Sequence, residues 1–287
     1  MKKFIAPLWV VVVLSCTEAP AQTDKFNEHI HKEFSLQKGA NASTLAIYNI
    51  DGLIKVEGYS GDKVIIDVDK TISAKTAGAL EKGKQEFKFE IDQDADTIMA
   101  YIAQPYDSRP HQRWQENNHH RRIEYRYRLD FTVKVPYNLN VSVSTVNDGD
   151  ITVSDISGKL NVHNVNGAIT LKNVKNDTKA RTVNGNVNAS YTALPPNQSD
   201  FYTLNGNLNI NYPSNLSADC EFKSFQGEFY TDFQNVETLP TRVIKQQEKN
   251  EHKTTYKLST ETAIRIGDGG RVFRFETFNG NIYLKKL

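Results

Sequence analysis

A short motif recurs through the second half of the chain and constrains its fold more than any other feature. It consists of an apolar residue, Asn, Gly, any residue and a second apolar residue, as in the segment from Val183 to Val187. Five copies, whose glycines are separated by 18, 18, 21 and 21 residues, contain Gly149, Gly167, Gly185, Gly206 and Gly227. A further copy surrounds Gly280. A nearly constant period of this length indicates that each copy is one supersecondary unit of a repetitive fold.

Two folds are compatible with this repeat. Asn-Gly between alternating apolar residues is a strong signal for a type I′ hairpin turn, which predicts an antiparallel hairpin meander. In a β-solenoid, by contrast, each coil lies on the next, and equivalent residues form continuous columns. Because the same residue types recur at the same position of each copy, we favour an all-β, β-solenoid or β-helix-like stack of coils of roughly 18 to 21 residues. The hairpin meander is the alternative.

The stacked arrangement makes two specific predictions about the Asn-Gly corner. The apolar residue before each Asn should form one inner column, and the Asn side chains should form a ladder in which each amide bonds the next. The predicted inner column contains Val146, Val165, Val183, Leu204, Phe225 and Phe278. The predicted ladder contains Asn147, Asn166, Asn184, Asn205, Gln226 and Asn279.

Residues 1–21 have the form of a secretion signal. Lys2 and Lys3 precede an apolar run from Phe4 to Leu14, which is shorter than the roughly 20 apolar residues that span a bilayer. Two processing routes compete. Cleavage after Ala21 is favoured, whereas a lipobox ending at Cys16 would give a lipid anchor on that residue. Either route predicts an exported protein of the periplasm, the outer membrane or the cell surface.

Composition narrows the classes of partner. The formal net charge is +1, which gives no overall attraction for nucleic acid, so no nucleic-acid partner is expected. Apart from Cys16 in the leader, the chain contains one cysteine, Cys220. We expect Cys220 to be buried and inert, so that stability comes from stacked strands and not from disulfides.

Two regions follow the leader. Region 22–136 should form an N-terminal β cap with helical and basic-loop inserts, which would keep the first solenoid edge from pairing with other chains. Region 137–287 should form the β-repeat region, with a charged, mobile loop inserted at 237–261. Within the cap we expect an early repeat copy at 47–56, one amphipathic helix within 73–87, and strands at 64–68, 87–91, 98–102 and 123–135.

The chain resembles a bacterial domain-of-unknown-function family of β-strand-repeat, adhesin-like proteins. The resemblance rests on the strand that runs into Val135-Pro136, on the segment Ser144-Thr145-Val146-Asn147, and on the later copies of that segment. It implies an exported β-solenoid of the cell envelope and supplies no catalytic residues. Asp148, which lies between Asn and Gly of the first copy, departs from the family pattern.

The insert from Asp107 to Arg122 is rich in Arg and His and is the most unusual chemistry in the sequence. A solvated basic loop is the plainer interpretation. The functional one is a surface-contact loop for an anionic glycan, a membrane surface or an envelope protein. A metal site through His111, His119 and His120 is a third interpretation, but their spacing matches no strong metal motif. The residues predicted for the contact loop are Arg109, Arg113, Trp114, Arg121 and Arg122.

No catalytic, cofactor-binding or metal-binding residue is predicted. Asp148, Asp150, Asp155 and Asp177 could supply the carboxylate pair of a polysaccharide-cleaving β-helix, but their scatter over corners is typical of turn-forming aspartates. His163 is expected at an outward position of a strand, because apolar residues alternate around it.

The sequence therefore predicts a non-catalytic exported envelope protein. Its flat, Asn- and Thr-rich outer faces would serve as an adhesin-like scaffold or binding surface for an unidentified ligand. The alternatives are a carbohydrate-active enzyme on a β-helix and a periplasmic sensor or regulatory binding module. A deep groove with two carboxylates within roughly 10 Å would favour the enzyme.

Overall fold

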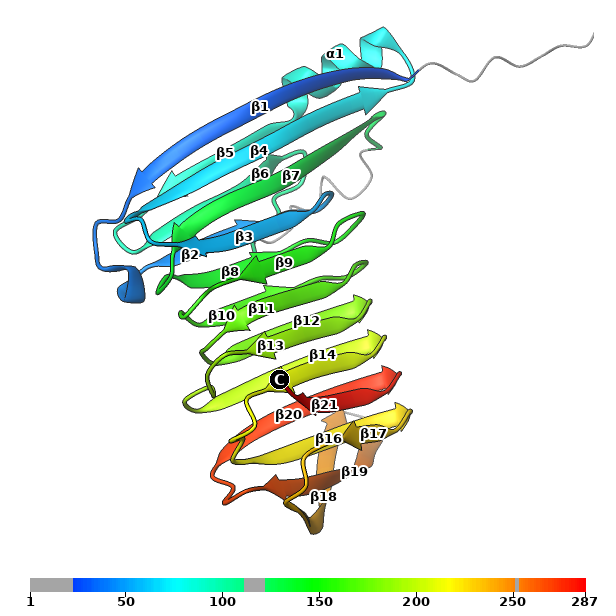
Figure 1. The fold of residues 1–287 in the computed structure, drawn as a ribbon. Helices are drawn as coiled ribbons and strands as arrows, with labels where there is room; N and C mark the ends of the chain where they lie inside the picture. Colours follow the sequence, from blue (N-terminus) through cyan, green and yellow to red (C-terminus); the bar gives the residue numbers. More distant parts are fainter. Residues whose placement is uncertain (1–22, 111–121, 251–252) are drawn as a thin grey trace, which may run out of the picture.

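The structure, a computed structural model, describes residues 23–110, 122–250 and 253–287, with the backbone alone between 241 and 261. Within these residues the chain forms two sheets that face each other along a stack of coils (Figure 1). We call the ten-stranded sheet, which ends in β1 and β17, sheet A, and the eleven-stranded sheet, which ends in β18 and β5, sheet B. Successive coils pair in parallel, so the predicted β-solenoid is confirmed and the hairpin meander is wrong.

Each central coil contributes one strand to each sheet, with the Asn-Gly motif at the corner between them. Apolar residues alternate along the central strands, and their side chains point into the space between the sheets. Each central coil consists of one strand of sheet B followed by one strand of sheet A. The four coils are β8 (Asn140–Ser144) and β9 (Ile151–Ser154), β10 (Leu160–His163) and β11 (Ile169–Val174), β12 (Thr178–Asn184) and β13 (Val187–Tyr191), and β14 (Gln198–Asn205) and β15 (Leu208–Tyr212).

Region 22–136 adds two more coils to the stack. The first coil consists of β2 (Thr44–Tyr48) and β3 (Ile54–Tyr59) and contains the early repeat copy. The second coil consists of β6 (Thr97–Gln104) and β7 (Tyr125–Pro136). In this coil β6 runs parallel to β2, and β7 runs parallel to β3. The connection from β6 to β7 holds the basic insert, which therefore replaces the Asn-Gly corner of this coil.

Antiparallel strands and a helix close this end of the stack. In sheet B, β5 (Lys88–Gln93) pairs with β6. In sheet A, β4 (Lys63–Ala74) pairs with β7, and β1 (Asp24–Ser35) pairs with β4. The helix α1 (Ala77–Glu86) begins at Thr76, whose hydroxyl accepts a hydrogen bond from the Ala79 amide. A 3-10 turn, η1 (Ala40–Ala42), precedes β2. No helix of the described ranges has the length and hydropathy needed to cross a membrane.

The other end of the stack is not built in sequence order. The chain leaves β15, forms β16 (Ala218–Gln226) and β17 (Phe229–Thr231), and continues into a long antiparallel hairpin of β18 (Val236–Asn250) and β19 (Lys253–Ile266). It then returns as β20 (Arg271–Asn279) and β21 (Ile282–Lys286), which lie between the β14/β15 and β16/β17 coils. The loop predicted at 237–261 was therefore wrong, because this segment pairs with itself as a hairpin and β19 also pairs with β16.

The core is a set of in-register columns that run through the coils. On the sheet B side, small and aliphatic side chains near the cap give way to large aromatic ones toward the C-terminal end. There, stacked rings lie 5.6 Å apart between Phe201 and Phe275 and 5.2 Å apart between Phe275 and Phe222. This column consists of Ala100, Ile47, Val143, Val162, Ala180, Phe201, Phe275 and Phe222.

The predicted inner column at the corner is wrong in its direction. Its members line up across the coils, but they lie on the outer side of the corner, where Phe225 is 71% exposed and stacks on Phe278 at 4.6 Å. The inward position belongs to the preceding polar residue, such as Thr203, because its side chain reaches a glycine carbonyl of the neighbouring coil. The order of the column also differs, since Phe278 lies between Leu204 and Phe225.

The predicted amide ladder at the corner is confirmed for five of its six residues. Each Nδ2 donates to the Oδ1 of the next coil over 2.7–3.0 Å, in the order Asn279, Asn205, Asn184, Asn166, Asn147. Gln226 lies beside Asn279 in the strand register. The ladder fixes the register of the coils at their exposed edge.

Candidate functional site

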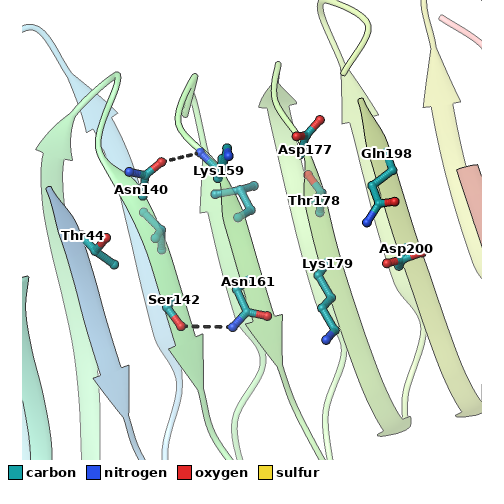
Figure 2. Close-up of a pocket in the computed structure, with 12 residues that line it drawn as sticks. Thr44, Asn140, Ser142, Lys159, Asn161, Asp177, Thr178, Lys179, Gln198 and Asp200 are labelled. Atoms are coloured by element: carbon teal, nitrogen blue, oxygen red, sulfur yellow. Dashed lines mark hydrogen bonds between the residues drawn. The ribbon is translucent and has the colours of Figure 1, made fainter. Parts of the chain in front are cut away.

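The outer face of sheet B, expected to be flat, is hollowed across its middle strands. The depression has a volume of about 640 Å³ and crosses β2, β8, β10, β12 and β14 (Figure 2). We call it the sheet B groove. Its polar lining consists of Thr44, Asn140, Ser142, Lys159, Asn161, Asp177, Thr178, Lys179, Gln198 and Asp200.

Strand register places these side chains in rows that cross the coils. Ser142 lies beside Asn161, which lies beside Lys179, which in turn lies beside Asp200. Asn161 Nδ2 donates to Ser142 Oγ over 3.3 Å, and the Lys159 amide donates to Asn140 Oδ1 over 3.0 Å. Because each outward residue is flanked by buried neighbours, the direction of these side chains is fixed by the strands.

The charges of the groove are unevenly compensated. Lys159 and Lys179 are exposed, and within the described residues no carboxylate lies within 4.0 Å of either ammonium group. Arg181, two residues beyond Lys179 on β12, lies over the ring of Tyr202 with 5.8 Å between its Cζ and the ring centroid. The middle of sheet B therefore presents three cations without an acidic partner in the described part of the chain.

The positive charges of this region affect the pKa of His163. It lies on β10 between Ser144 and Arg181 in the register, at the outward position that the sequence predicts, and its Nε2 is 2.9 Å from Asn161 Oδ1. Its pKa is lowered from the ordinary histidine value, first by burial and then by the positive charges of Lys179 and Arg181.

The carboxylates of the groove are engaged. Asp177 accepts hydrogen bonds from the Asn197 amide at 2.9 Å and from Asn197 Nδ2 at 2.8 Å. Asp200 lies 3.7 Å from the guanidinium of Arg274. Both aspartates therefore have partners that hold them in place, which is a structural use of the carboxylate.

The aspartates considered as a catalytic pair do not converge. Asp148 and Asp150 lie between β8 and β9, at the Asn-Gly corner, whereas Asp155 follows β9 and Asp177 precedes β12, at the opposite edge of the stack. Asp150 accepts from the Ala168 amide at 2.8 Å, and Asp155 accepts from Asn173 Nδ2 at 2.9 Å. Asp148 adopts a positive φ of 50°, which is typical of an aspartate in a tight turn.

The predicted contact loop is described at its two ends. Arg109 is half-buried, donates to both carboxylate oxygens of Asp107, and stacks over Tyr101 at 4.2 Å. The Tyr101 hydroxyl lies within 2.9 Å of carboxylate oxygens of Glu90 and Asp92. Arg122 is exposed. Arg113, Trp114 and Arg121 lie outside the described residues, as do His111, His119, His120 and the leader with Cys16, so their roles stay predictions.

Cys220 lies in the core between the sheets, fully buried and without a disulfide partner. Burial raises the pKa of its thiol. The predicted burial of Cys220 is confirmed, and its inertness stays a prediction. In the described ranges no three His, Cys, Asp or Glu side chains are grouped so that they could hold a metal ion.

The groove residues were not predicted as a site. Alternation along β10 and β12 indicates that Lys159, Asn161 and Lys179 point outward, and this signal is readable in the sequence. The sequence does not reveal that five strands bring these side chains together with short polar ones such as Thr44 and Ser142. That arrangement depends on the register between coils.

Comparison with known proteins finds a family model and several solved structures to which this chain is similar. The family model described as Toastrack DUF4097 matches residues 130–263. Among solved structures, a "putative cell adhesion protein" from Clostridium sporogenes is 9% identical, with 91% of this chain and 100% of that chain covered and a TM-score of 0.46. A "putative adhesin" from Bacteroides fragilis is 9% identical, with 91% and 97% covered and a TM-score of 0.36.

A third structure, described as a "putative lipid binding protein" from Parabacteroides distasonis, is 10% identical, with 90% and 96% covered and a TM-score of 0.27. No curated protein matches the chain. The predicted resemblance to a domain-of-unknown-function family is confirmed by the family model. Over residues 130–263 the chain is therefore similar to the family described as Toastrack DUF4097.

Proposed function

We propose that this chain is a non-catalytic exported protein of the cell envelope, an adhesin-like scaffold that binds its ligand in the sheet B groove. The observation that carries the proposal is the groove itself, which crosses five parallel strands and is lined by hydroxyl, amide and charged side chains in register. An elongated polar ligand that lies across these strands can form hydrogen bonds with several of these side chains at once.

The backbone beneath the groove supports a binding role because it is held on both sides. Parallel ladders connect every coil to the next, and the Asn ladder secures the exposed corners. The backbone of such a frame is ordered before a ligand binds, so binding does not have to order it, which favours affinity from a shallow site.

Export rests on the leader of residues 1–21, with cleavage after Ala21 favoured over lipidation of Cys16. Cell fractionation of the tagged full chain, compared with a Cys16→Ala variant, tests this part of the proposal. A tag that stays with the cytoplasmic fraction would contradict export, and a tag released from the membrane by Cys16→Ala would show that the lipid anchor holds it.

The enzyme alternative is less well supported by the groove. A glycosidase needs two carboxylates that flank the scissile bond with one available as an acid. Asp177 is held by Asn197, and Asp200 faces Arg274. A binding surface agrees better with acidic groups that are already satisfied within the protein.

Blocking the groove tests the binding role directly. Ser142→Trp places a large neutral side chain among the lining residues, while Thr170→Trp places the same side chain on the outer face of sheet A. We expect the mature chain, residues 22–287, to bind purified envelope polysaccharide in a surface-immobilised assay, and Ser142→Trp to abolish that binding. Binding that survives Ser142→Trp, or that fails equally in Thr170→Trp, contradicts a ligand site in the groove.

A further inference from the structure

We propose that the ligand of the sheet B groove is an acidic polysaccharide, whose carboxylates are held by Lys159, Lys179 and Arg181 while its hydroxyl groups bond the amides between them. This inference rests on the proposed binding function and adds the chemical class of the ligand.

Charge complementarity is the first argument. Lys159 and Lys179 line the groove, Arg181 follows Lys179 along β12, and none of the three has an acidic partner within 4.0 Å among the described residues. Other cations of this face are paired, since Lys223 lies 2.6 Å from Glu276 and Arg274 lies 2.8 Å from Glu221. An anionic ligand would therefore give these cations the close acidic partner that they lack among the described residues.

The acids of the groove offset only part of this charge. Asp177 stays charged, because Asn197, which donates to both of its oxygens, is neutral, and Asp200 shares Arg274 with Glu221. The three cations Lys159, Lys179 and Arg181 therefore outnumber these two aspartates by one. The lowered pKa of His163, to which Lys179 and Arg181 contribute, supports a positive field over β10 and β12.

The spacing of the strands is the second argument. Lys179 and Arg181 lie on β12, and Lys159 directly precedes β10, the adjacent parallel strand about 4.8 Å away. The row of Lys179 continues through Asn161 to Ser142 on one side and to Asp200 on the other. An extended chain that crosses β8, β10 and β12 thus meets a hydroxyl, an amide and a cation in succession. The hydroxyl-binding groups are Asn140, Ser142, Asn161 and Gln198.

Two other polyanions fit the groove less well. Single-stranded nucleic acid is bound largely by stacking of its bases on exposed aromatic rings, whereas Tyr202 is half-buried and already lies beneath Arg181. A membrane presents a broad surface of headgroups, whereas these cations lie in or beside a depression that is about 640 Å³ in volume. A hydroxyl-rich, flexible chain with spaced carboxylates agrees with both the shape and the lining.

Binding of the mature chain to hyaluronate, neutral dextran, a single-stranded oligonucleotide and phosphatidylglycerol vesicles tests the ligand class. The triple variant Lys159→Gln, Lys179→Gln, Arg181→Gln removes the groove cations. The matched control Lys134→Gln, Lys172→Gln, Lys285→Gln removes the same charge from outward positions of sheet A. These substitutions are on the surface, so both triple variants should keep the unfolding midpoint of the parent.

We expect hyaluronate to bind more tightly than dextran, and its affinity to fall roughly tenfold in the groove triple variant but not in the control. Raising the salt concentration from about 0.05 to about 0.5 M should weaken the same interaction. Equal binding of dextran, or unchanged hyaluronate binding in the groove triple variant, overturns the acidic ligand class.

The controls separate this failure from failure of the proposed function. Envelope polysaccharide binding that is lost in Ser142→Trp but unaffected by the groove triple variant and by salt keeps the groove as the site and rejects the acidic ligand. Polysaccharide binding that also survives Ser142→Trp rejects both. Oligonucleotide or vesicle binding as tight as hyaluronate binding, with the same dependence on the groove cations, rejects the polysaccharide in favour of that ligand.

Discussion

The hydroxyl of Thr203 donates a hydrogen bond to the carbonyl oxygen of Gly185 on the neighbouring coil, over 2.8 Å, and Thr203 is fully buried. The same bond recurs from Thr182 to Gly167 at 2.9 Å and from Thr277 to Gly206 at 3.1 Å. A ladder of threonines thus runs along the inside of the corner, parallel to the Asn ladder on the outside. It gives the corner carbonyls a partner where water is excluded.

Replacement of Thr203 by Val should therefore destabilise the fold although the side chain keeps its shape. The carbonyl of Gly185 would lose its side-chain donor, and an unsatisfied buried acceptor costs about 1–3 kcal/mol. The free energy of unfolding, measured by chemical denaturation, should fall by this amount. Thr170→Val, at a half-buried outward position of β11, is the control and should change it much less. Equal effects of the two substitutions would show that the buried hydrogen bond contributes nothing specific.

The glycines of the corner predict a second, opposite pair of effects. A Cβ atom on Gly185, which has a φ of 156°, would lie 2.3 Å from the carbonyl oxygen of Gly167 on the neighbouring coil. Gly185→Ala should destabilise the protein by about 1–3 kcal/mol, because the coils cannot separate without breaking the ladders. In contrast, a Cβ on Gly78 in α1 meets nothing within 4 Å, so Gly78→Ala should stabilise the helix by up to about 1 kcal/mol.

Thermal or chemical unfolding of both alanine variants measures the difference. A Gly185→Ala variant as stable as the parent would mean that the coils tolerate a wider spacing at the corner than the structure has.

The edge strand β1 predicts a dependence of stability on pH. His29 Nδ1 lies 2.8 Å from Asp69 Oδ1, and His31 Nδ1 lies 2.7 Å from Asp67 Oδ1, with Glu33 3.7 Å from His31. Hydrogen bonding to Asp69 raises the pKa of His29, and hydrogen bonding to Asp67 raises that of His31, in both cases against a smaller effect of burial. The charged form of each histidine is thus favoured in the folded state.

Since both pKa values are raised above the unfolded value of about 6.5, the stabilisation is complete below that pH and is lost as the pH rises through the folded values. The unfolding midpoint should therefore decrease between about pH 6 and about pH 8. The variant His29→Gln, His31→Gln should lack this part of the decrease. A parent and variant with the same pH profile would show that these pairs do not hold β1.

The sequence predicted the stack well because the repeat identifies equivalent positions, and equivalence alone sets the Asn ladder. It did not predict which corner side chain points inward. Periodicity places Thr203 and Leu204 on opposite faces, and hydrophobicity then favours Leu204 as the buried one. In the structure Thr203 is the buried residue instead, because the buried carbonyl of Gly185 requires a donor and the Thr203 hydroxyl supplies it. That carbonyl belongs to another coil and leaves no local signal.

The sequence also did not predict where the coil of β20 and β21 lies in the stack. The copies around Gly227 and Gly280 follow the same motif, so their order in the stack cannot be read from the motif itself. The hairpin of β18 and β19 moves the chain away and back, and β20 then fits between β14 and β16. The stacked rings of Phe201, Phe275 and Phe222 fix this order through packing between distant segments. The groove was hidden for the same reason, because its rows arise from the register of five strands.

His163 provides a last prediction, which tests the field over the groove without any ligand. Its pKa is lowered by burial first, then by Lys179 and Arg181. Removing both cations in Lys179→Gln, Arg181→Gln should raise the pKa of His163 toward its ordinary value, although burial should keep it below that value. A depressed histidine pKa stabilises the fold above the unfolded pKa of about 6.5 and loses this effect as the pH falls through the folded value. The double variant should therefore lose less stability on mild acidification than the parent.

Titration of the His163 ring by NMR measures the pKa directly, with Lys172→Gln on sheet A as the control. A pKa of His163 that is the same in the parent and the double variant would mean that solvent screens these cations, and that the groove exerts too weak a field to select an acidic ligand.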